Sequence, residues 1–206
     1  MSGRTIATGL VVSALVATLA ALLLPVQLFG ETASAASSAP SFDDDGGGTV
    51  NTRYGPLTAL DRDFVRKVRL AGLWEMPAGR QAQERGTTAA VRTAGNHLVA
   101  GHTELDRLAV NAGRALNIPL PNQPNDDQQS WLSQMNAAQG KDFAPVFAEL
   151  LRRAHGKVFA LIALVRDQTE NTMVRALATR TNAVVLDHIT VLENTGQVDF
   201  DTLYSS

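Results

Sequence analysis

The chain has 206 residues, of which 45% are hydrophobic and 18% charged, a composition that suits one globular domain with a sizeable core plus some additional chain. The formal net charge is -2, so there is no basic excess and we expect no nucleic-acid partner. The sequence contains no cysteine, which excludes disulfides, thiol nucleophiles, cysteine-ligated zinc and lipid attachment through cysteine.

Residues 1–35 predict export. Arg4 precedes an almost wholly apolar run over residues 6–30, and Ala33-Ser34-Ala35 follows as a small-x-small cleavage pattern. This order is typical of a secretory signal peptide, and Pro25 also favours cleavage. The apolar run is long for a signal peptide, so an uncleaved membrane anchor is the alternative. We therefore expect a secreted or extracytoplasmic protein that contacts a membrane only through residues 6–30, if these are retained.

Residues 36–55 predict a disordered linker. The segment is rich in Ser, Gly, Asp and Pro, and it contains Asp43-Asp44-Asp45 followed by three glycines. Three aspartates in a row suggest a calcium ligand set, but the twelve-residue spacing of a calcium loop does not follow. A flexible tether is therefore the preferred interpretation, and the folded domain is expected over residues 56–206.

The apolar residues of the domain recur at steps of three and four, which predicts helices, and no segment shows the alternation of a strand. Thr58 with Asp61 resembles a capping box, Thr87 is the N-cap candidate of the second helix, and Asn171 or Thr172 that of the last. Residues 197–206 show no clear pattern. The predicted helices, which Gly86, Gly140 and Gly196 help to delimit, cover residues 57–85, 88–116, 126–139, 142–168 and 172–195.

These segments describe an all-α fold. Four of the helices are long and amphipathic, and short turns join the first to the second and the third to the fourth. The second and third long helices are joined by a longer connection with three prolines and the short helix over residues 126–139. One long crossover is the ferritin-like arrangement, so we expect a ferritin-like four-helix bundle whose crossover carries a short extra helix.

One polar residue interrupts the apolar stripe of each long helix: these are Glu75, His102, His155 and His188. Counting from the turn between the last two helices, at about 1.5 Å per residue, brings His155 and His188 within roughly 4.5 Å in height. For the first two helices the count is ambiguous. His97 matches the level of Glu75 better, whereas His102 matches the apolar stripe better, so both stay candidates.

Three imidazoles and one carboxylate in a helical core would suit a single zinc, iron, copper or manganese ion. The di-metal site of ferritin-like oxidases needs Glu-x-x-His on two helices, and this motif is absent. The competing interpretation is a metal-free layer of hydrogen-bonded polar residues, so one bound ion and none both stay open. Gly72, Gly101 and Gly156 lie within three residues of the candidates and are expected to permit close helix approach there.

Four stretches resemble a known family. They are residues 73–82, residues 91–109 with His102-Thr103-Glu104-Leu105, Gly140-Lys141-Asp142-Phe143 with Ala154-His155-Gly156-Lys157, and Asp187-His188. Over about residues 60–196 the chain is similar to a bacterial secreted family of unknown function, domain of unknown function 4142. The resemblance implies an exported ferritin-like bundle, and it maps the recurring polar positions of the family onto the same four residues. Gly101 and Ala154 depart from the pattern, which usually has an acid before the His, and this removes partners for the imidazoles.

No nucleophile elbow, phosphate-binding loop, dinucleotide fingerprint or H-E-x-x-H motif occurs in the sequence. We therefore expect an exported helical module without enzymatic activity, which contacts a cell-envelope component or a protein partner. The alternative hypothesis is a metal-binding or redox bundle that uses Glu75, His102, His155 and His188.

Overall fold

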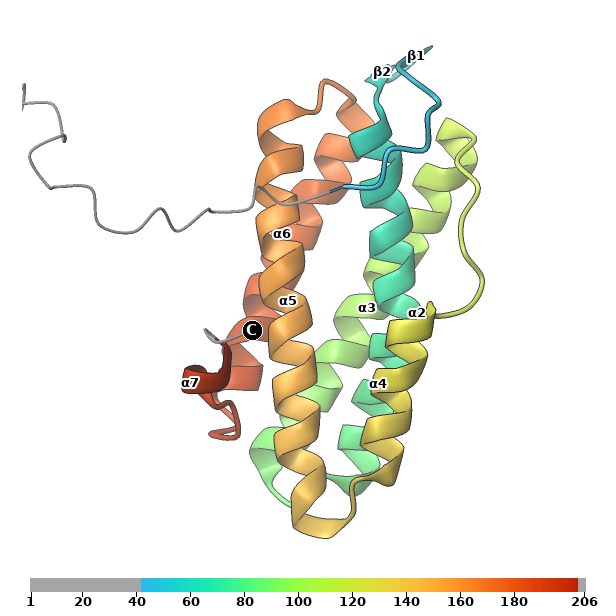
Figure 1. Ribbon diagram of the computed structural model, residues 1–206. Coiled ribbons are helices and arrows are strands. Elements are labelled where there is room, and N and C mark those ends of the chain that lie inside the picture. The colour runs from blue at the N-terminus through green and yellow to red at the C-terminus, as the bar shows by residue number, and fades with distance from the viewer. Residues whose placement is uncertain (1–41, 204–206) are drawn as a thin grey trace, which may run out of the picture. The chain divides into compact units, whose positions relative to one another are not determined.

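The computed structural model describes residues 42–203, and these are predominantly helical, as the sequence predicts (Figure 1). The signal peptide or anchor expected over residues 1–35 lies outside the described residues. Between residues 42 and 203, no helix combines the length and the apolar character that crossing a membrane requires. The elements are β1 (Val50–Thr52), β2 (Gly55–Leu57), α2 (Ala59–Arg85), α3 (Ala89–Leu116), α4 (Asp126–Ala137), η2 (Gly140–Asp142), α5 (Phe143–Gln168), α6 (Thr172–Glu193) and α7 (Phe200–Leu203).

The N-caps of the long helices follow local chemistry. Thr58 and Asp61 form the predicted capping box, in which Oγ1 of Thr58 accepts from the Asp61 N–H at 3.2 Å and Oδ2 of Asp61 accepts from the Thr58 N–H at 2.8 Å. Asn171 caps α6. The prediction of Thr87 as the cap of α3 is wrong by one residue, because Thr88 stands three positions before Val91 and accepts from its N–H at 3.3 Å.

The C-terminal ends differ in conformation. Asn117 ends α3 in the left-handed region with φ 55°, and Gly140 and Gly196 also have positive φ, at 55° and 66°. Gly86 caps α2 with φ -62° and ψ 119°, so it ends the helix in extended backbone without using the left-handed freedom of glycine. Glycine is required there for steric reasons, because a Cβ would lie 2.5 Å from the Ala82 carbonyl oxygen.

The four long helices of the described chain lie side by side. α2 packs antiparallel against α3, α5 packs antiparallel against α6, and the two pairs meet through α3 with α6 and α2 with α5 (Figure 1). The connection after α3 returns along the domain, and α4 packs against α2 and α5. As a result, α3 and α5 run in the same direction.

The apolar core of the part of the chain that the structure describes consists of two clusters. One is built from β2, the first half of α2, the second half of α3, the end of α5 and the start of α6, and it includes Phe64, Leu105 and Ile162. The other contains Trp74 and Phe147 with residues from α4 and the ends of the long helices. Along each of α3, α5 and α6, one buried histidine separates the two clusters. A polar level therefore crosses the middle of the core.

The hairpin was not predicted from the sequence. β1 pairs antiparallel with β2, with Val50 opposite Leu57. Nδ2 of Asn171 donates to Oγ1 of Thr52 and to the Gly55 carbonyl, both at 3.2 Å, which ties the hairpin to the cap of α6. Strands of three residues are too short to show an alternating pattern. An isolated hairpin also has little stability of its own, so this hairpin forms because of its tertiary contacts.

The segment over residues 42–55 differs from the disordered linker that the sequence predicts. Asp45 forms ion pairs with Arg62 and with Arg66, the latter at 2.7 Å, and Nη1 of Arg62 donates to the Gly48 carbonyl at 3.0 Å. The two guanidinium groups hold the pKa of Asp45 well below its usual range. Composition could not reveal this, because the partners of the aspartate lie on a helix that follows it by 17 and 21 residues.

Candidate metal centre

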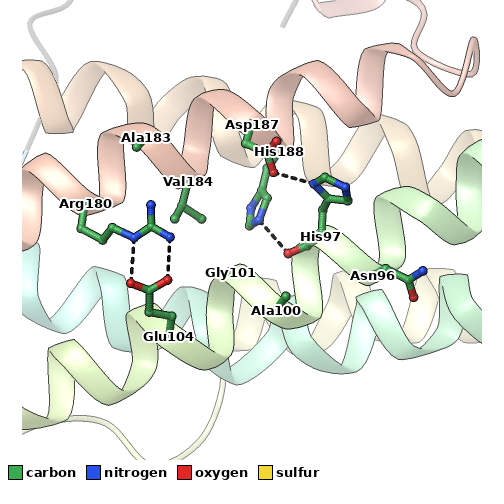
Figure 2. A pocket seen from close by; sticks show the side chains of 10 residues that line it. All are labelled: Asn96, His97, Ala100, Gly101, Glu104, Arg180, Ala183, Val184, Asp187 and His188. Carbon is green, nitrogen blue, oxygen red and sulfur yellow. Dashed lines mark hydrogen bonds and ion pairs between the residues drawn. The ribbon is translucent and has the colours of Figure 1, made fainter.

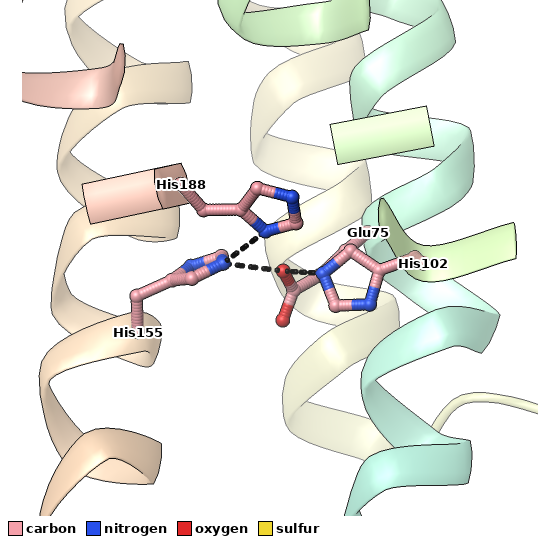
Figure 3. Close-up of side chains that lie close together, drawn as sticks. All are labelled: Glu75, His102, His155 and His188. Atoms are coloured by element: carbon pink, nitrogen blue, oxygen red, sulfur yellow. Dashed lines mark hydrogen bonds and ion pairs between the residues drawn. The ribbon is translucent and has the colours of Figure 1, made fainter. Parts of the chain in front are cut away.

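The four polar stripe residues meet at one level of the core. Each offers one ligand atom, and these atoms all lie within 4.8 Å of one another. Figure 3 shows the side chains converging from α2, α3, α5 and α6. All four residues are buried, with exposed fractions of 4% or less. The residues are Glu75, His102, His155 and His188.

The structure resolves the ambiguity between His97 and His102. His102 lies on the buried stripe of α3, four residues after Leu98, and it points toward Glu75. The side chain of His97 is 41% exposed, and its Nδ1 lies 2.7 Å from Oδ2 of Asp187 at the surface (Figure 2). The side chain of His97 therefore does not join the cluster, although its backbone carbonyl does contact it.

The distances between donor atoms suit one ion. Oε2 of Glu75 lies 2.7 Å from Nε2 of His102 and 3.2 Å from Nε2 of His155. Nε2 of His155 lies 3.0 Å from Nδ1 of His188. A tetrahedral ion with bonds of about 2.0–2.1 Å holds its ligand atoms roughly 3.3 Å apart. The cluster is therefore close to the size of a single coordination sphere.

Backbone carbonyls fix the tautomers of two imidazoles. Nδ1 of His155 donates to the Leu151 carbonyl at 2.7 Å, and Nε2 of His188 donates to the His97 carbonyl at 3.0 Å. A carbonyl oxygen only accepts, so in each neutral ring the proton is on the nitrogen that faces the carbonyl. The other two nitrogens then face each other at 3.0 Å with their lone pairs. Only a cation or an additional proton makes this contact favourable.

Other atoms of the cluster have no hydrogen-bond partner in the described structure. They are Oε2 of Glu75 and both ring nitrogens of His102. Oε2 of Glu75 and Nε2 of His102 are close, but they are not aligned as donor and acceptor. A buried polar atom without a partner costs about 1–3 kcal/mol, and such atoms are rare in folded proteins. The donors converge on a shared point instead of pairing with each other.

Burial sets the protonation of the cluster. Desolvation raises the pKa of Glu75 to about 7, opposed by the charge of His155. Desolvation also lowers the pKa of His102 and of His155 to about 4 and that of His188 to about 3. The imidazoles are therefore neutral at pH 7, which is the form that binds metal ions.

One of the three nearby glycines is required by the cluster. A Cβ at Gly101 would lie 2.5 Å from Nε2 of His188 and 2.7 Å from Cγ1 of Val184, so only glycine leaves room for this imidazole. A Cβ at Gly72 would be 3.2 Å from Oδ1 of Asp106, a tight contact away from the ligands. At Gly156 it would meet only the flexible end of Arg152, so the expected close approach is absent there.

Sequence reasoning missed the two carbonyl contacts. The bond from His155 to Leu151 spans four residues on one helix, so it is a local signal that helix geometry alone could have suggested. The bond from His188 to His97 joins α6 to α3, and no local pattern indicates it. The surface pair of His97 with Asp187 depends on the same approach of the two helices.

Comparison with known proteins assigns the chain to a family. Residues 49–195 match the family described as Domain of unknown function (DUF4142). The chain belongs to this family. The matched range of the DUF4142 protein extends from the hairpin to the end of α6 and contains all four buried ligand candidates. No curated protein and no solved structure matches the chain. The activity of this DUF4142 protein must therefore be argued from its geometry.

Proposed function

We propose that this DUF4142 protein binds one first-row transition-metal ion through Glu75, His102, His155 and His188. The observation that carries the proposal is the 3.0 Å contact between Nε2 of His155 and Nδ1 of His188, whose protons are held elsewhere by carbonyls. Without a cation or an additional proton, two lone pairs face each other in a buried site. An ion at the common centre replaces this repulsion with metal–ligand bonds and also gives partners to Glu75 and His102.

The donor set favours particular ions. Three imidazole nitrogens and one carboxylate oxygen suit zinc, copper or iron better than magnesium or calcium, which prefer oxygen ligands. A divalent ion on one carboxylate and three neutral imidazoles leaves a single positive charge in the core. The carbonyl contacts of His155 and His188 supply the outer hydrogen bonds that usually orient ligating histidines.

The proposed role of the ion is to hold the helices together. Four protein ligands in a buried site are typical of structural metal centres, whereas hydrolytic centres keep one position for water. One ligand comes from each long helix, so a bound ion would join all four. This supports a module without enzymatic activity. A redox role is the alternative if the ion is copper or iron.

We also propose a ferritin-like arrangement and an extracytoplasmic address for the domain. The single long connection between α3 and α5, which leaves these helices parallel, supports the arrangement. The apolar run and cleavage pattern within residues 1–35 support export from a bacterial cell, with a cell-envelope component or a protein as partner. Detection of the protein in the cytoplasm alone, after fractionation of the producing cells, would contradict the address.

Elemental mass spectrometry of the purified protein tests the metal proposal. We expect about one ion per chain in the unsubstituted protein and in the His97→Ala control, and none in a His102→Ala, His155→Ala double variant. Circular dichroism shows whether each variant keeps its helices. Absence of bound metal in the folded protein, even after incubation with zinc, iron, copper and manganese, would leave a metal-free polar layer as the correct interpretation.

A further inference from the structure

A groove of about 570 Å³ lies between α3 and α6, directly outside the candidate metal centre. We call it the α3–α6 groove, and Figure 2 shows the residues that line it, among them His97, Gly101, Glu104, Arg180 and His188. His188 belongs both to this lining and to the four-residue cluster, whereas Glu75, His102 and His155 do not line the groove. The imidazole of His188 therefore separates the groove from the cluster.

The charged side chains of the groove pair with one another. Arg180 donates from Nε and Nη2 to the two carboxylate oxygens of Glu104, at 2.8 and 2.6 Å, and His97 contacts Asp187 at 2.7 Å. No charged lining residue is left to recognise a charged ligand held in the groove. These properties suit a passage better than a binding site.

One buried imidazole, that of His188, stands between the groove and the cluster. On the groove side, His188 is held by one hydrogen bond to the His97 carbonyl, at 3.0 Å. Gly101 contributes no side chain beside the ring, so the backbone of α3 forms this part of the wall. Rotation of the His188 side chain toward the groove would break that single bond and uncover the cluster. The carbonyl bond of His155 points to its own helix, away from this opening.

We propose that the metal ion enters and leaves its site through the α3–α6 groove, and that His188 is the ligand that moves to let it pass. This inference rests on the proposed metal centre and adds the path and the moving residue. Glu75, His102 and His155 form the part of the site that stays in place. His188 completes the coordination when it returns to its hydrogen bond with His97. The groove therefore controls the rates of binding and release without changing the affinity.

The test uses a substitution that narrows the groove without changing any of the four proposed metal ligands. Ala100 is exposed and lines the groove, so Ala100→Trp places a large ring in the path. Ala163 is exposed on α5 and does not line this groove, so Ala163→Trp is the matched control. Zinc association is followed by stopped flow with a competing zinc-sensitive dye, and zinc release by addition of a chelator.

We expect Ala100→Trp to slow association and release together by about tenfold or more, with the Kd for zinc unchanged, because the obstacle affects the path and not the bound state. Ala163→Trp should keep the rates of the unsubstituted protein. Unchanged rates in Ala100→Trp would overturn the access route, as would equal slowing in the control or a weaker Kd without slower release. Failure of the unsubstituted protein to bind zinc would instead refute the metal centre itself.

Discussion

Two histidines on α3 lie five residues apart and have opposite surroundings. His102 is 2% exposed, faces Glu75 and lies between the two apolar clusters of the core. The side chain of His97 is 41% exposed and pairs with Asp187 at the surface. Five residues turn an α-helix by about 140° beyond one full turn, which carries a side chain from the core face to the opposite side. Helical phase alone therefore makes one histidine a ligand candidate and the other a surface group.

His97 and His102 also differ in how much an interaction partner contributes to the stability of the protein. An exposed pair of polar side chains, such as His97 with Asp187, contributes at most about 1 kcal/mol, because water solvates both groups well without it. Buried polar atoms without partners cost more, and two of them, Oε2 of Glu75 and Nε2 of His102, lie 2.7 Å apart in the cluster. The surface pair is therefore complete without an additional ligand, whereas the buried group is not.

The largest expected effect separates these two histidines directly. Because even a hydrogen-bond partner of a ligand is worth 10- to 100-fold in metal affinity, His102→Ala should raise the Kd for zinc by at least about 100-fold. His97→Ala keeps all four ligand side chains and should change the Kd by less than about threefold, since its backbone carbonyl remains. Titration calorimetry measures both. Equal losses in the two variants would contradict the assignment.

The stability of the metal-free protein should depend on pH because of the buried histidines and Glu75. Burial lowers the pKa of His102 and His155 from 6.5 to about 4 and that of His188 to about 3, so the stability from these groups is present above pH 6.5 and lost toward pH 4. Glu75 acts in the opposite sense, because its pKa is raised from 4.5 to about 7 and its contribution is lost as the pH rises through 7. The contribution of the three histidines to the pH dependence of stability therefore exceeds the opposite contribution of Glu75.

The free energy of unfolding should therefore fall between pH 6.5 and pH 4, by a few kcal/mol as an order of magnitude. Urea unfolding of the metal-free protein at a series of pH values measures this. Removing one of the three groups with His188→Gln should make the dependence shallower. A dependence as steep in that variant as in the unsubstituted protein would show that His188 is not buried in its neutral form.

Two glycines offer a smaller effect of opposite sign. Gly101→Ala should destabilise the protein by about 1–3 kcal/mol, because the new Cβ would lie 2.5 Å from Nε2 of His188 and must displace it. Gly156→Ala should stabilise it by about 0.5–1 kcal/mol through helix propensity, since the Cβ meets only the end of Arg152 at 3.2 Å. Chemical denaturation compares them. Stabilisation by both substitutions would mean that α3 and α6 are farther apart than described.

The smallest effect is expected at the surface of the α3–α6 groove. Arg180→Ala removes the exposed ion pair with Glu104 and should cost less than about 1 kcal/mol. Its Kd for zinc should match that of the unsubstituted protein, because Arg180 contacts no ligand. Chemical denaturation and zinc titration are the two readouts. A large loss of zinc affinity would show that the metal site includes residues of the groove.

Much of the helical domain follows from local sequence. The Thr58–Asp61 capping box forms as expected. The residues of the apolar stripe predicted for the second long helix are buried, and they are Val91, Ala94, Leu98, His102, Leu105, Ala109, Ala112 and Leu116. Apolar period and cap chemistry are local properties, so the chain displays them directly. The stripes also identified the four residues that converge, because a polar residue on an apolar stripe must enter the core.

The remainder depends on contacts between distant segments. Counting residues from the turns could not choose between His97 and His102, because the stagger of α2 and α3 is a product of packing. The hairpin depends on Asn171, and the order around Asp45 depends on Arg62, and neither partner is near in the sequence. The tautomer of His188 depends likewise on a carbonyl of another helix.

The most direct test of the central claim is X-ray absorption spectroscopy at the metal edge of the protein loaded with one equivalent of zinc. We predict a shell of about four light donors at roughly 2.0–2.1 Å, with the multiple-scattering signature of three imidazoles. The same spectrum should be found for His97→Ala. A shell of about six oxygen donors without imidazole scattering would contradict the proposed metal centre, since the ion would then lie hydrated at the surface and not among the four buried side chains.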